Sequence, residues 1–177
     1  MTTDAELIAR VLTDDDRTAF GALIERHQPL VRGLLHKVTG GDAARADDLA
    51  QEAFLRAYRG LATYRGGAQL SSWLCRIALN LFLSEARRKP DPELADPIPE
   101  ATSPEQELED RHDLEGALAQ LRAEERVALA LTFREELTHE EAAARMHWPL
   151  GTLKTHVWRA KRKLRDLLSA PAPCGGL

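Results

Sequence analysis

The prediction of the fold starts from one stretch of sequence, Asp47-Asp48-Leu49-Ala50-Gln51-Glu52-Ala53-Phe54-Leu55-Arg56-Ala57-Tyr58. At about 100° per residue, most of its apolar side chains fall in one broad arc, as in an amphipathic helix: Leu49, Ala50, Ala53, Phe54 and Ala57, continuing to Leu61. The opposite face presents a polar surface with one apolar side chain at its centre: Asp48, Gln51, Glu52, Leu55 and Arg59. Such a face suits docking onto the helices of another protein, and a solvated surface would show the same periodicity.

The composition indicates an all-α protein. Of the 177 residues, 44% are hydrophobic and only 5% aromatic. The β-branched residues are scattered and no long apolar/polar alternation occurs, so we expect no strands. No stretch approaches the ~18 uninterrupted apolar residues of a membrane span. Residues 1–6 lack the features of a secretory signal, so we expect a cytoplasmic protein.

The net charge of −4 is unevenly distributed along the chain. Residues 1–89 carry 13 basic and 11 acidic side chains, residues 90–116 carry 1 and 10, and residues 117–177 carry 10 and 7. The acidic middle is rich in proline, which prevents a helix and keeps the backbone extended. We therefore expect two small helical domains, residues 1–89 and 104–170, joined by an acidic proline-rich linker at 90–103 and followed by a flexible tail at 171–177. The acidity of the linker serves either solubility or the tracking of a basic channel on a partner.

Other signals mark the helices of the first half. Pro29 is expected to break or kink a helix that begins near Asp16. After a glycine-containing loop at 64–69, Ser71 or Ser72 is expected to cap a further helix. Trp73 shares a face of that helix with other apolar residues, so it is either a core residue or a stacking platform. The helix ends in the cations Arg87, Arg88 and Lys89, which complement its dipole and are able to neutralise phosphates.

The second half shows the pattern of a helix-turn-helix. A helix is expected to start at Ser103-Pro104, with a core-facing series of Leu108, Leu114, Leu118 and Leu121. The spacing Thr138-x-x-Glu141 then predicts a short capped helix, a turn at 147–151, and a long helix. The long helix has an inward stripe formed by Leu153, Val157, Ala160, Leu164 and Leu167.

The outward face of that long helix points to DNA. Residues 152–166 carry six basic side chains against one acidic side chain. Trp158 stands in the middle of this face, where it suits a thymine methyl group or a sugar. Thr155 and Arg159 are suited to reading base edges, and the cations Lys154, Lys161 and Arg162 to holding phosphates.

No pattern of catalysis or metal binding is present in the sequence. Cys75 and Cys174 are far apart, which indicates neither a disulfide framework nor a zinc site. The six histidines lack metal-ligand spacing, and no catalytic triad or phosphate-binding glycine loop occurs. We therefore expect no metal, no cofactor and no enzymatic activity.

Three motifs resemble region 2 of extracytoplasmic-function (ECF) sigma factors, in residue type and spacing: residues 48–54, residues 64–66 and residues 73–80. The resemblance implies that the first motif, with Asp48, Gln51, Glu52, Leu55 and Arg59, docks on the clamp helices of the polymerase β′ subunit. It also implies that the loop and the following helix capture a flipped base of the melted −10 element, which needs an amide or backbone partner for the base edge. The implied −10 residues are Tyr64, Arg65, Gln69, Arg76, Asn80, Arg87 and Arg88. Cys75 departs from the aromatic residue common at its place in the family.

Residues 137–143 and 149–160 resemble sigma region 4, which reads the −35 element in the major groove. The implied −35 residues are Thr152, Lys154, Thr155, Trp158, Arg159, Lys161 and Arg162. Residues 152–156 also look like the helix-turn-helix of response-regulator activators. Those activators carry an α/β receiver domain, and the first half of this chain shows none of its strands.

The resemblance as a whole implies a sigma factor that directs promoter recognition and transcription initiation, in a stress or envelope response. The implied partners are core RNA polymerase, through its β′ clamp helices and β flap, promoter DNA and an anti-sigma factor, with no small-molecule substrate. Two alternatives remain: a helix-turn-helix regulator that never joins polymerase, and a sigma mimic that titrates an anti-sigma factor. A small helical hydrolase ranks far below both.

Overall fold

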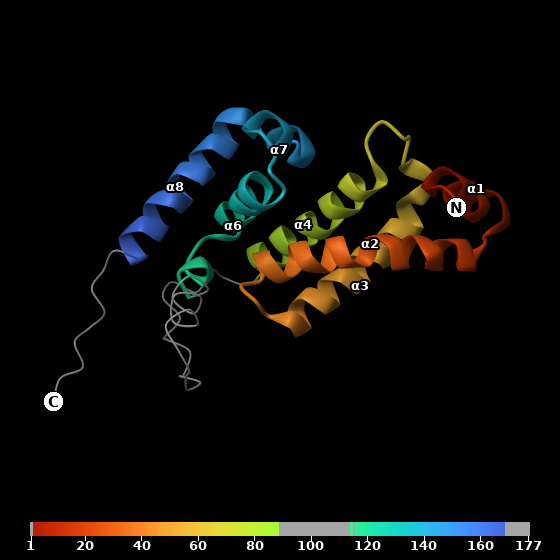
Figure 1. The fold of residues 1–177 in the computed structure, drawn as a ribbon, viewed down its shortest axis with the longest axis horizontal. Helices are drawn as coiled ribbons and strands as arrows, with labels where there is room; N and C mark the ends of the chain where they lie inside the picture. Colours follow the sequence, from red (N-terminus) through yellow and green to blue (C-terminus); the bar gives the residue numbers. More distant parts are fainter. Residues whose placement is uncertain (1, 89–113, 115, 169–177) are drawn as a thin grey trace. The chain divides into compact units, whose positions relative to one another are not determined.

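The computed structural model describes residues 2–88, 114 and 116–168. It divides into two compact units, the first ending at Glu85 and the second beginning at Ala86 (Figure 1). Every regular element of the described residues is helical, which confirms the all-α class. None of the helices in this part of the chain combines the length and the apolar character of a membrane span. The predicted linker at 90–103, the helix start at Ser103-Pro104 and the tail at 171–177 lie outside the described residues.

The first unit is built from helices that surround one apolar core. The core includes Leu23, Leu35, Phe54, Leu79 and Phe82, all less than a tenth exposed. The elements are α1 (Asp4–Asp14), α2 (Arg17–Val38), α3 (Ala43–Gly60), the 3₁₀ turn η1 (Leu61–Thr63) and α4 (Leu70–Arg88). Because the predicted apolar arc of α3 is buried along its whole length, its polar arc faces outward.

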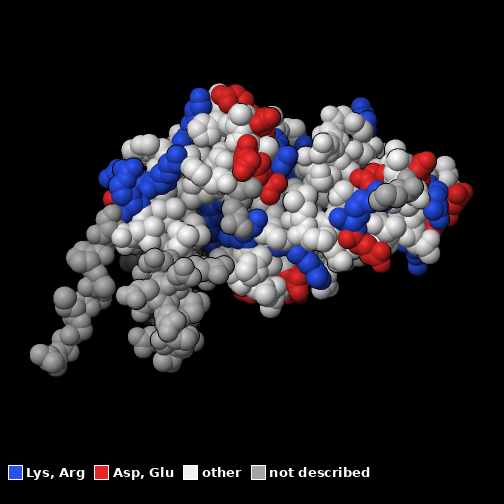
Figure 2. Space-filling view, in the orientation of Figure 1, with Lys and Arg blue, Asp and Glu red and all other residues white. Residues whose placement is uncertain are grey.

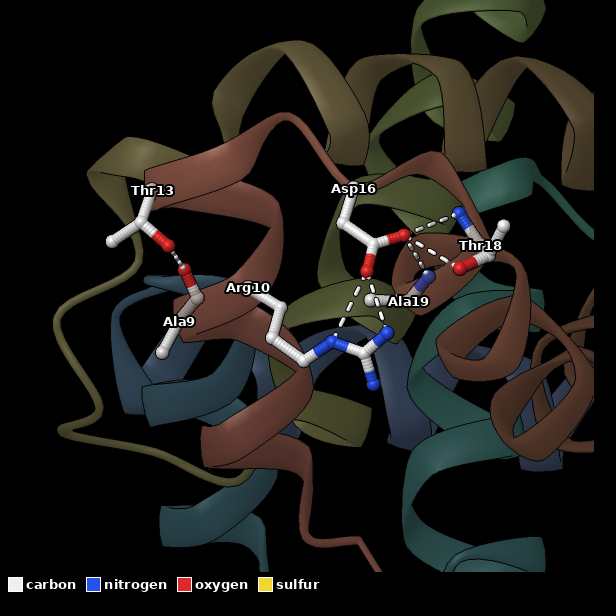
Figure 3. A network of polar contacts seen from close by, with 6 residues as sticks. All are labelled: Ala9, Arg10, Thr13, Asp16, Thr18 and Ala19. Atoms are coloured by element: carbon white, nitrogen blue, oxygen red, sulfur yellow. Dashed lines mark hydrogen bonds and ion pairs between the residues drawn. The ribbon is translucent and has the colours of Figure 1, made fainter.

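Asp16 fixes the junction between α1 and α2 (Figure 3). Its carboxylate accepts hydrogen bonds from the backbone N–H groups of Thr18 at 2.9 Å and Ala19 at 3.1 Å. It also accepts from the hydroxyl of Thr18 and from Nη2 of Arg10, both at 2.6 Å. The Thr18 hydroxyl, the Ala19 amide and Arg10 all favour the ionised form, so they hold the pKa of Asp16 far below its usual value. Asp16 is thus both the N-cap of α2 and its link to α1.

Of the two expected effects of Pro29, a break or a kink, the break does not occur, because α2 continues through it to Val38. Proline removes one backbone hydrogen bond from a helix interior. Leu23 before it and Val31 and Leu34 after it are all buried, so packing on both sides of Pro29 outweighs that loss.

The first residue of helix α4 and the burial of Trp73 both differ from the prediction. The helix begins at Leu70, so Ser71 and Ser72 lie inside the helix and do not cap it. Trp73 is half-buried and not part of the fully buried face, and its ring lies 5.4 Å from that of Tyr64. Arg45 of α3 ties α3 to α4, since its guanidinium lies over the ring of Phe82.

The second unit is a compact bundle around a smaller core. Its elements are α6 (Ala123–Leu129), the π-helical segment η2 (Ala130–Arg134), α7 (His139–Met146) and α8 (Leu150–Leu168). Before α6, Leu121 is buried and Leu118 packs against the core. Leu114 is 41% exposed, so its predicted place in the core is wrong.

The helix-turn-helix is present as expected. Thr138 and Glu141 form the predicted capping box at the start of α7. His147 ends α7 in a left-handed conformation with φ 55°, and the chain then turns into α8. Leu153, Val157 and Ala160 are buried, while Leu164 and Leu167 at the far end of α8 are half-buried. The inward stripe of α8 therefore fixes which side chains face outward.

Candidate nucleic-acid interface

All seven residues predicted to meet duplex DNA lie on the exposed side of α8. In Figure 2, lysine and arginine side chains follow this helix along its length. Trp158 is 60% exposed, the largest exposed fraction of any large hydrophobic side chain in the described part of the chain. A large apolar ring among cations, on a helix that follows a short helix and a turn, is typical of a DNA-reading helix.

The cations of α8 are not equivalent. Lys154 has the carboxylate of Glu140 at 3.8 Å, and Arg162 has that of Asp166 at 4.0 Å. Among the residues that the structure describes, Arg159 has neither a hydrogen bond nor an ion pair, so its guanidinium is available for bidentate contact with a guanine edge. Arg162 also lies 5.6 Å from the ring centroid of Trp158.

Thr155 has its hydroxyl proton already engaged. The hydroxyl donates to the carbonyl oxygen of Gly151 at 2.8 Å, one turn earlier in α8. The oxygen keeps lone pairs to accept a hydrogen bond, and the methyl group stays exposed. In this geometry Thr155 suits an amino group of adenine or cytosine, which donates in the major groove.

The predicted −10 residues fall into two groups in the first unit. Tyr64 closes the loop before α4, where its hydroxyl donates to the carbonyl oxygen of Ala68 at 2.5 Å. Arg65 and Gln69 of this loop are exposed. Asn80 is exposed too, but at ~1.5 Å per residue it lies about 16 Å along α4 from Gln69. Gln69 and Asn80 are therefore separated along α4, while Tyr64 of the loop packs against Trp73 between them.

The remaining members of that set also lie on α4. Arg76 is half-buried, and Arg87 and Arg88 are exposed in the last turn of the helix. Cations in a last turn complement the helix dipole.

The residues of α3 that were predicted to dock on a protein lie on its outward side, and a groove lies beside them. Leu55 is 53% exposed, and Asp48, Gln51 and Arg59 are exposed beside it. Glu52 is held by Arg56 at 2.7 Å. Gln51 and Leu55 line a groove of about 530 Å³ between α2 and α3.

Sequence reasoning missed the contribution of α2 to this groove. Phe20 and Ile24 form its apolar wall, and Arg17 and Arg32 add positive charge to its lining. Phe20 also packs edge-on against Tyr58 of α3, with 4.9 Å between the ring centroids. The polar and apolar residues of α2 alternate as in any amphipathic helix, so no local signal marks these four as neighbours of α3.

A helix-turn-helix with an exposed basic face in one unit, and a groove beside an exposed leucine in the other, are features typical of transcription factors. Comparison with known families narrows this class. The family model of Sigma-70 region 2 matches residues 23–90, and that of Sigma-70, region 4 matches residues 111–164.

Two curated relatives match along almost the whole chain. The RNA polymerase sigma-H factor of Pseudomonas aeruginosa is 33% identical over 93% of this chain and 93% of its own length. The ECF RNA polymerase sigma-E factor of Escherichia coli K12 is 31% identical, covering 92% of each chain. The chain belongs to the sigma-70 family, as an RNA polymerase sigma factor of the extracytoplasmic-function group, and this family consists of transcription initiation factors.

Solved structures agree with this assignment. The sigma factor RpoE from Bartonella quintana, in complex with the anti-sigma factor NepR, has a TM-score of 0.64 and 26% identity, covering 85% of this chain and 97% of that one. CnrH in complex with the cytosolic domain of CnrY has a TM-score of 0.65 over 96% of this chain, and its 22% identity shows the fold alone. The predicted family is confirmed, and the sigma factor is favoured over a regulator that never joins polymerase.

Proposed function

We propose that this sigma factor docks on core RNA polymerase through α3 and the groove beside it, and places α8 on duplex −35 DNA. The observation that carries this proposal is the outward face of α8, where Trp158 and Arg159, which has no partner among the described residues, lie opposite a buried stripe. A face that served solubility alone would carry charges of both signs and would not expose a tryptophan among them. The first unit then receives one strand of the opened −10 element.

On the −35 duplex, the residues of α8 have separate tasks. Arg159 reads a guanine, and Thr155 accepts from an adenine or cytosine amino group. Trp158 covers a thymine methyl group or a sugar. Thr152, Lys154, Lys161 and Arg162 hold phosphates and set the register without reading sequence.

The docking face of the first unit suits helices of a protein partner. Leu55 supplies an apolar anchor, the groove beside it accepts an apolar side chain, and Asp48, Gln51, Glu52 and Arg59 form a polar rim. We assign this face to the β′ clamp helices, and the second unit to the β flap.

Because Gln69 and Asn80 are separated along α4, we assign the loop and Asn80 to two subsites on the opened strand. The loop at Tyr64, Arg65 and Gln69 takes one nucleotide, and Asn80 meets a different one through its amide. Arg76, Arg87 and Arg88 of α4 then contact backbone phosphates. Because unpaired bases present their Watson–Crick edges, amide and backbone groups at both subsites are able to read them.

The chemistry of RNA synthesis belongs to the polymerase in this proposal, and the chain adds no catalytic step, cofactor or small-molecule substrate. Because the proposed partner is core RNA polymerase, we infer that the protein is cytoplasmic. The similarity to RpoE, solved with the anti-sigma factor NepR, supports an anti-sigma factor as a further partner. Release from such a partner would link transcription to a stress or envelope signal.

Transcription by core RNA polymerase over a randomised promoter library tests the proposal. With this protein added, we expect a selected set of promoters that share a −35 and a −10 element. The Asn80→Ala variant should alter the selected −10 bases and leave the amount of core that the protein pulls down unchanged. Failure of the wild-type protein to bind core would contradict the proposal and favour a regulator. Core binding without promoter selection would favour a sigma mimic.

A further inference from the structure

The π-helical segment η2 places an aromatic ring next to the DNA-reading helix. At the end of η2 the N–H of Glu135 donates to the carbonyl oxygen of Ala130, five residues earlier, at 3.2 Å. In an α-helix the acceptor would be four residues earlier. Phe133 of this segment is 55% exposed. Short π-helical segments occur often at functional sites, and this one comes just before the helix-turn-helix.

Phe133 contacts one particular cation of α8. Nζ of Lys161 lies 4.7 Å from the centroid of the Phe133 ring, within the range of a cation–π interaction. Lys161 is itself exposed, at the edge of the outward face and next to the buried stripe. The two residues come from different elements, so the contact reaches from η2 to the DNA-facing side of α8.

An aromatic ring and a carboxylate differ in how much of a neighbouring cation's charge they leave available for a phosphate. Lys154 and Arg162 each have a carboxylate nearby, and that negative charge competes with a phosphate for the cation. The face of Phe133 attracts the ammonium of Lys161 without neutralising it. Lys161 is therefore restrained in direction and keeps its full charge for a phosphate.

We propose that Phe133 is a positioning residue that aims Lys161 at a DNA phosphate, so that the DNA-binding surface extends from α8 onto η2. The inference rests on the proposed placement of α8 on the −35 duplex. Held against the ring, the long lysine side chain loses less conformational freedom when it binds a phosphate. The competing explanation is that the lysine stem only shields the exposed ring from water.

The test measures the binding of the full-length protein, assembled with core RNA polymerase, to a promoter selected from the randomised library. Dissociation constants are determined over a series of salt concentrations for Phe133→Leu, Phe133→Tyr, Lys161→Ala and the Phe133→Leu/Lys161→Ala double variant. Leucine keeps an apolar side chain but has no aromatic face, whereas tyrosine keeps the face. Thermal unfolding of each variant, together with titration of the active fraction, accounts for any loss of folded protein.

We expect Lys161→Ala to reduce the slope of log binding constant against log salt by about 0.9, as for the loss of one phosphate contact. Phe133→Leu should weaken binding by roughly two- to fivefold and Phe133→Tyr should restore it. The double variant should bind no more weakly than Lys161→Ala alone, because the ring acts only through the lysine.

Three results would overturn the inference: additive losses in the double variant, unchanged binding by Phe133→Leu, or a Phe133→Tyr variant as weak as Phe133→Leu. Arg159→Ala in the same assay separates this inference from the proposed function. If Arg159→Ala impairs promoter binding while the Phe133 variants do not, only the role of Phe133 is lost. If neither Arg159→Ala nor Lys161→Ala changes binding, α8 does not contact the promoter and both proposals fail.

Discussion

Nζ of Lys163 lies 3.1 Å from Oε2 of Glu125, so a cation of the basic helix α8 neutralises a carboxylate buried beneath it. Glu125 is only 2% exposed. The same oxygen accepts a hydrogen bond from the backbone N–H of Arg122 at 3.0 Å, which stabilises the start of α6. Lys163 is thus a structural cation that fastens α8 to α6, unlike the outward cations of the same helix.

Loss of this cation should destabilise the second unit. Lys163→Ala leaves a buried carboxylate without its partner, which costs about 1–2 kcal/mol after discounting for the partial exposure of Lys163. Urea unfolding monitored by tryptophan fluorescence measures the loss. The matched Lys161→Ala variant removes an exposed cation that has no carboxylate partner among the described residues and loses only its contact with the Phe133 ring, about 0.5–1 kcal/mol, so it should be less destabilising than Lys163→Ala. Equal stability of the two variants would contradict the structural role of Lys163.

The stability of the first unit should depend on pH through Asp16. Because its pKa is held low in the folded protein, Asp16 stabilises the fold fully above the ordinary aspartate pKa of about 3.9. That contribution declines as the pH falls below this value toward the folded pKa. Asp16→Asn should therefore be less stable than wild type at about pH 6, and the difference should shrink toward about pH 2. Urea unfolding at each pH measures it.

Asp14 provides the control for that experiment. It lies at the end of α1, is exposed, and makes no hydrogen bond within the described part of the chain. Asp14→Asn should show no such convergence with wild type on acidification. A difference between wild type and Asp16→Asn that stays constant across the pH range would refute the role given to the Asp16 network.

The backbone at Glu136 predicts a stabilising substitution. Glu136 has φ 52°, a left-handed conformation that costs most residues about 1–2 kcal/mol and glycine almost nothing. Glu136→Gly should stabilise the second unit by about 0.5 kcal/mol, because the greater freedom of glycine in the unfolded chain offsets part of the gain. Thermal unfolding measures the change. Glu136→Ala keeps the Cβ atom and should bring no stabilisation; an equal gain in both variants would argue against backbone strain.

A carboxylate placed on the docking face should weaken binding to core polymerase. Leu55→Asp would bury an unpaired charge in the interface, and we expect at least about a tenfold loss of affinity. Since Leu55 is 53% exposed in the free protein, folding should be nearly unaffected. Leu12 of α1 is 49% exposed but lies outside the groove, so Leu12→Asp is the matched control. Fluorescence anisotropy with labelled protein gives both affinities, and comparable losses would rule out a specific docking face.

Sequence specificity at the −35 element should depend on Arg159. Arg159→Ala is expected to cost about 1–3 kcal/mol on the preferred promoter and to relax selection at one base position. Arg162→Ala, which removes a phosphate contact in this proposal, should weaken binding to all sequences by a similar factor. Sequencing of promoters selected by each variant distinguishes these outcomes. An Arg159→Ala variant with unchanged base preference would reassign Arg159 to the phosphates.

Much of the helical organisation was predictable because its signals are local. The capping box at Thr138 and the buried arc of α3 depend on residues within a turn or two of one another. The exposed face of α8 follows in the same way from its inward stripe. The continuity of α2 through Pro29 was not predictable, because tertiary packing outweighs the local preference of proline.

The sequence by itself therefore determined the all-α class, the family, and the side chains that α3 and α8 present outward, since periodicity alone sets which faces are buried. Only the tertiary structure decided that Lys163 is bound to Glu125, that Phe133 lies against Lys161, and that α2 completes the groove beside Leu55. These relationships join residues that are far apart in the chain, where periodicity and spacing carry no information about distance. They arise when packing of the core brings separate helices together. Because of that packing, Lys161 and Lys163 of one helix have different partners and therefore different roles.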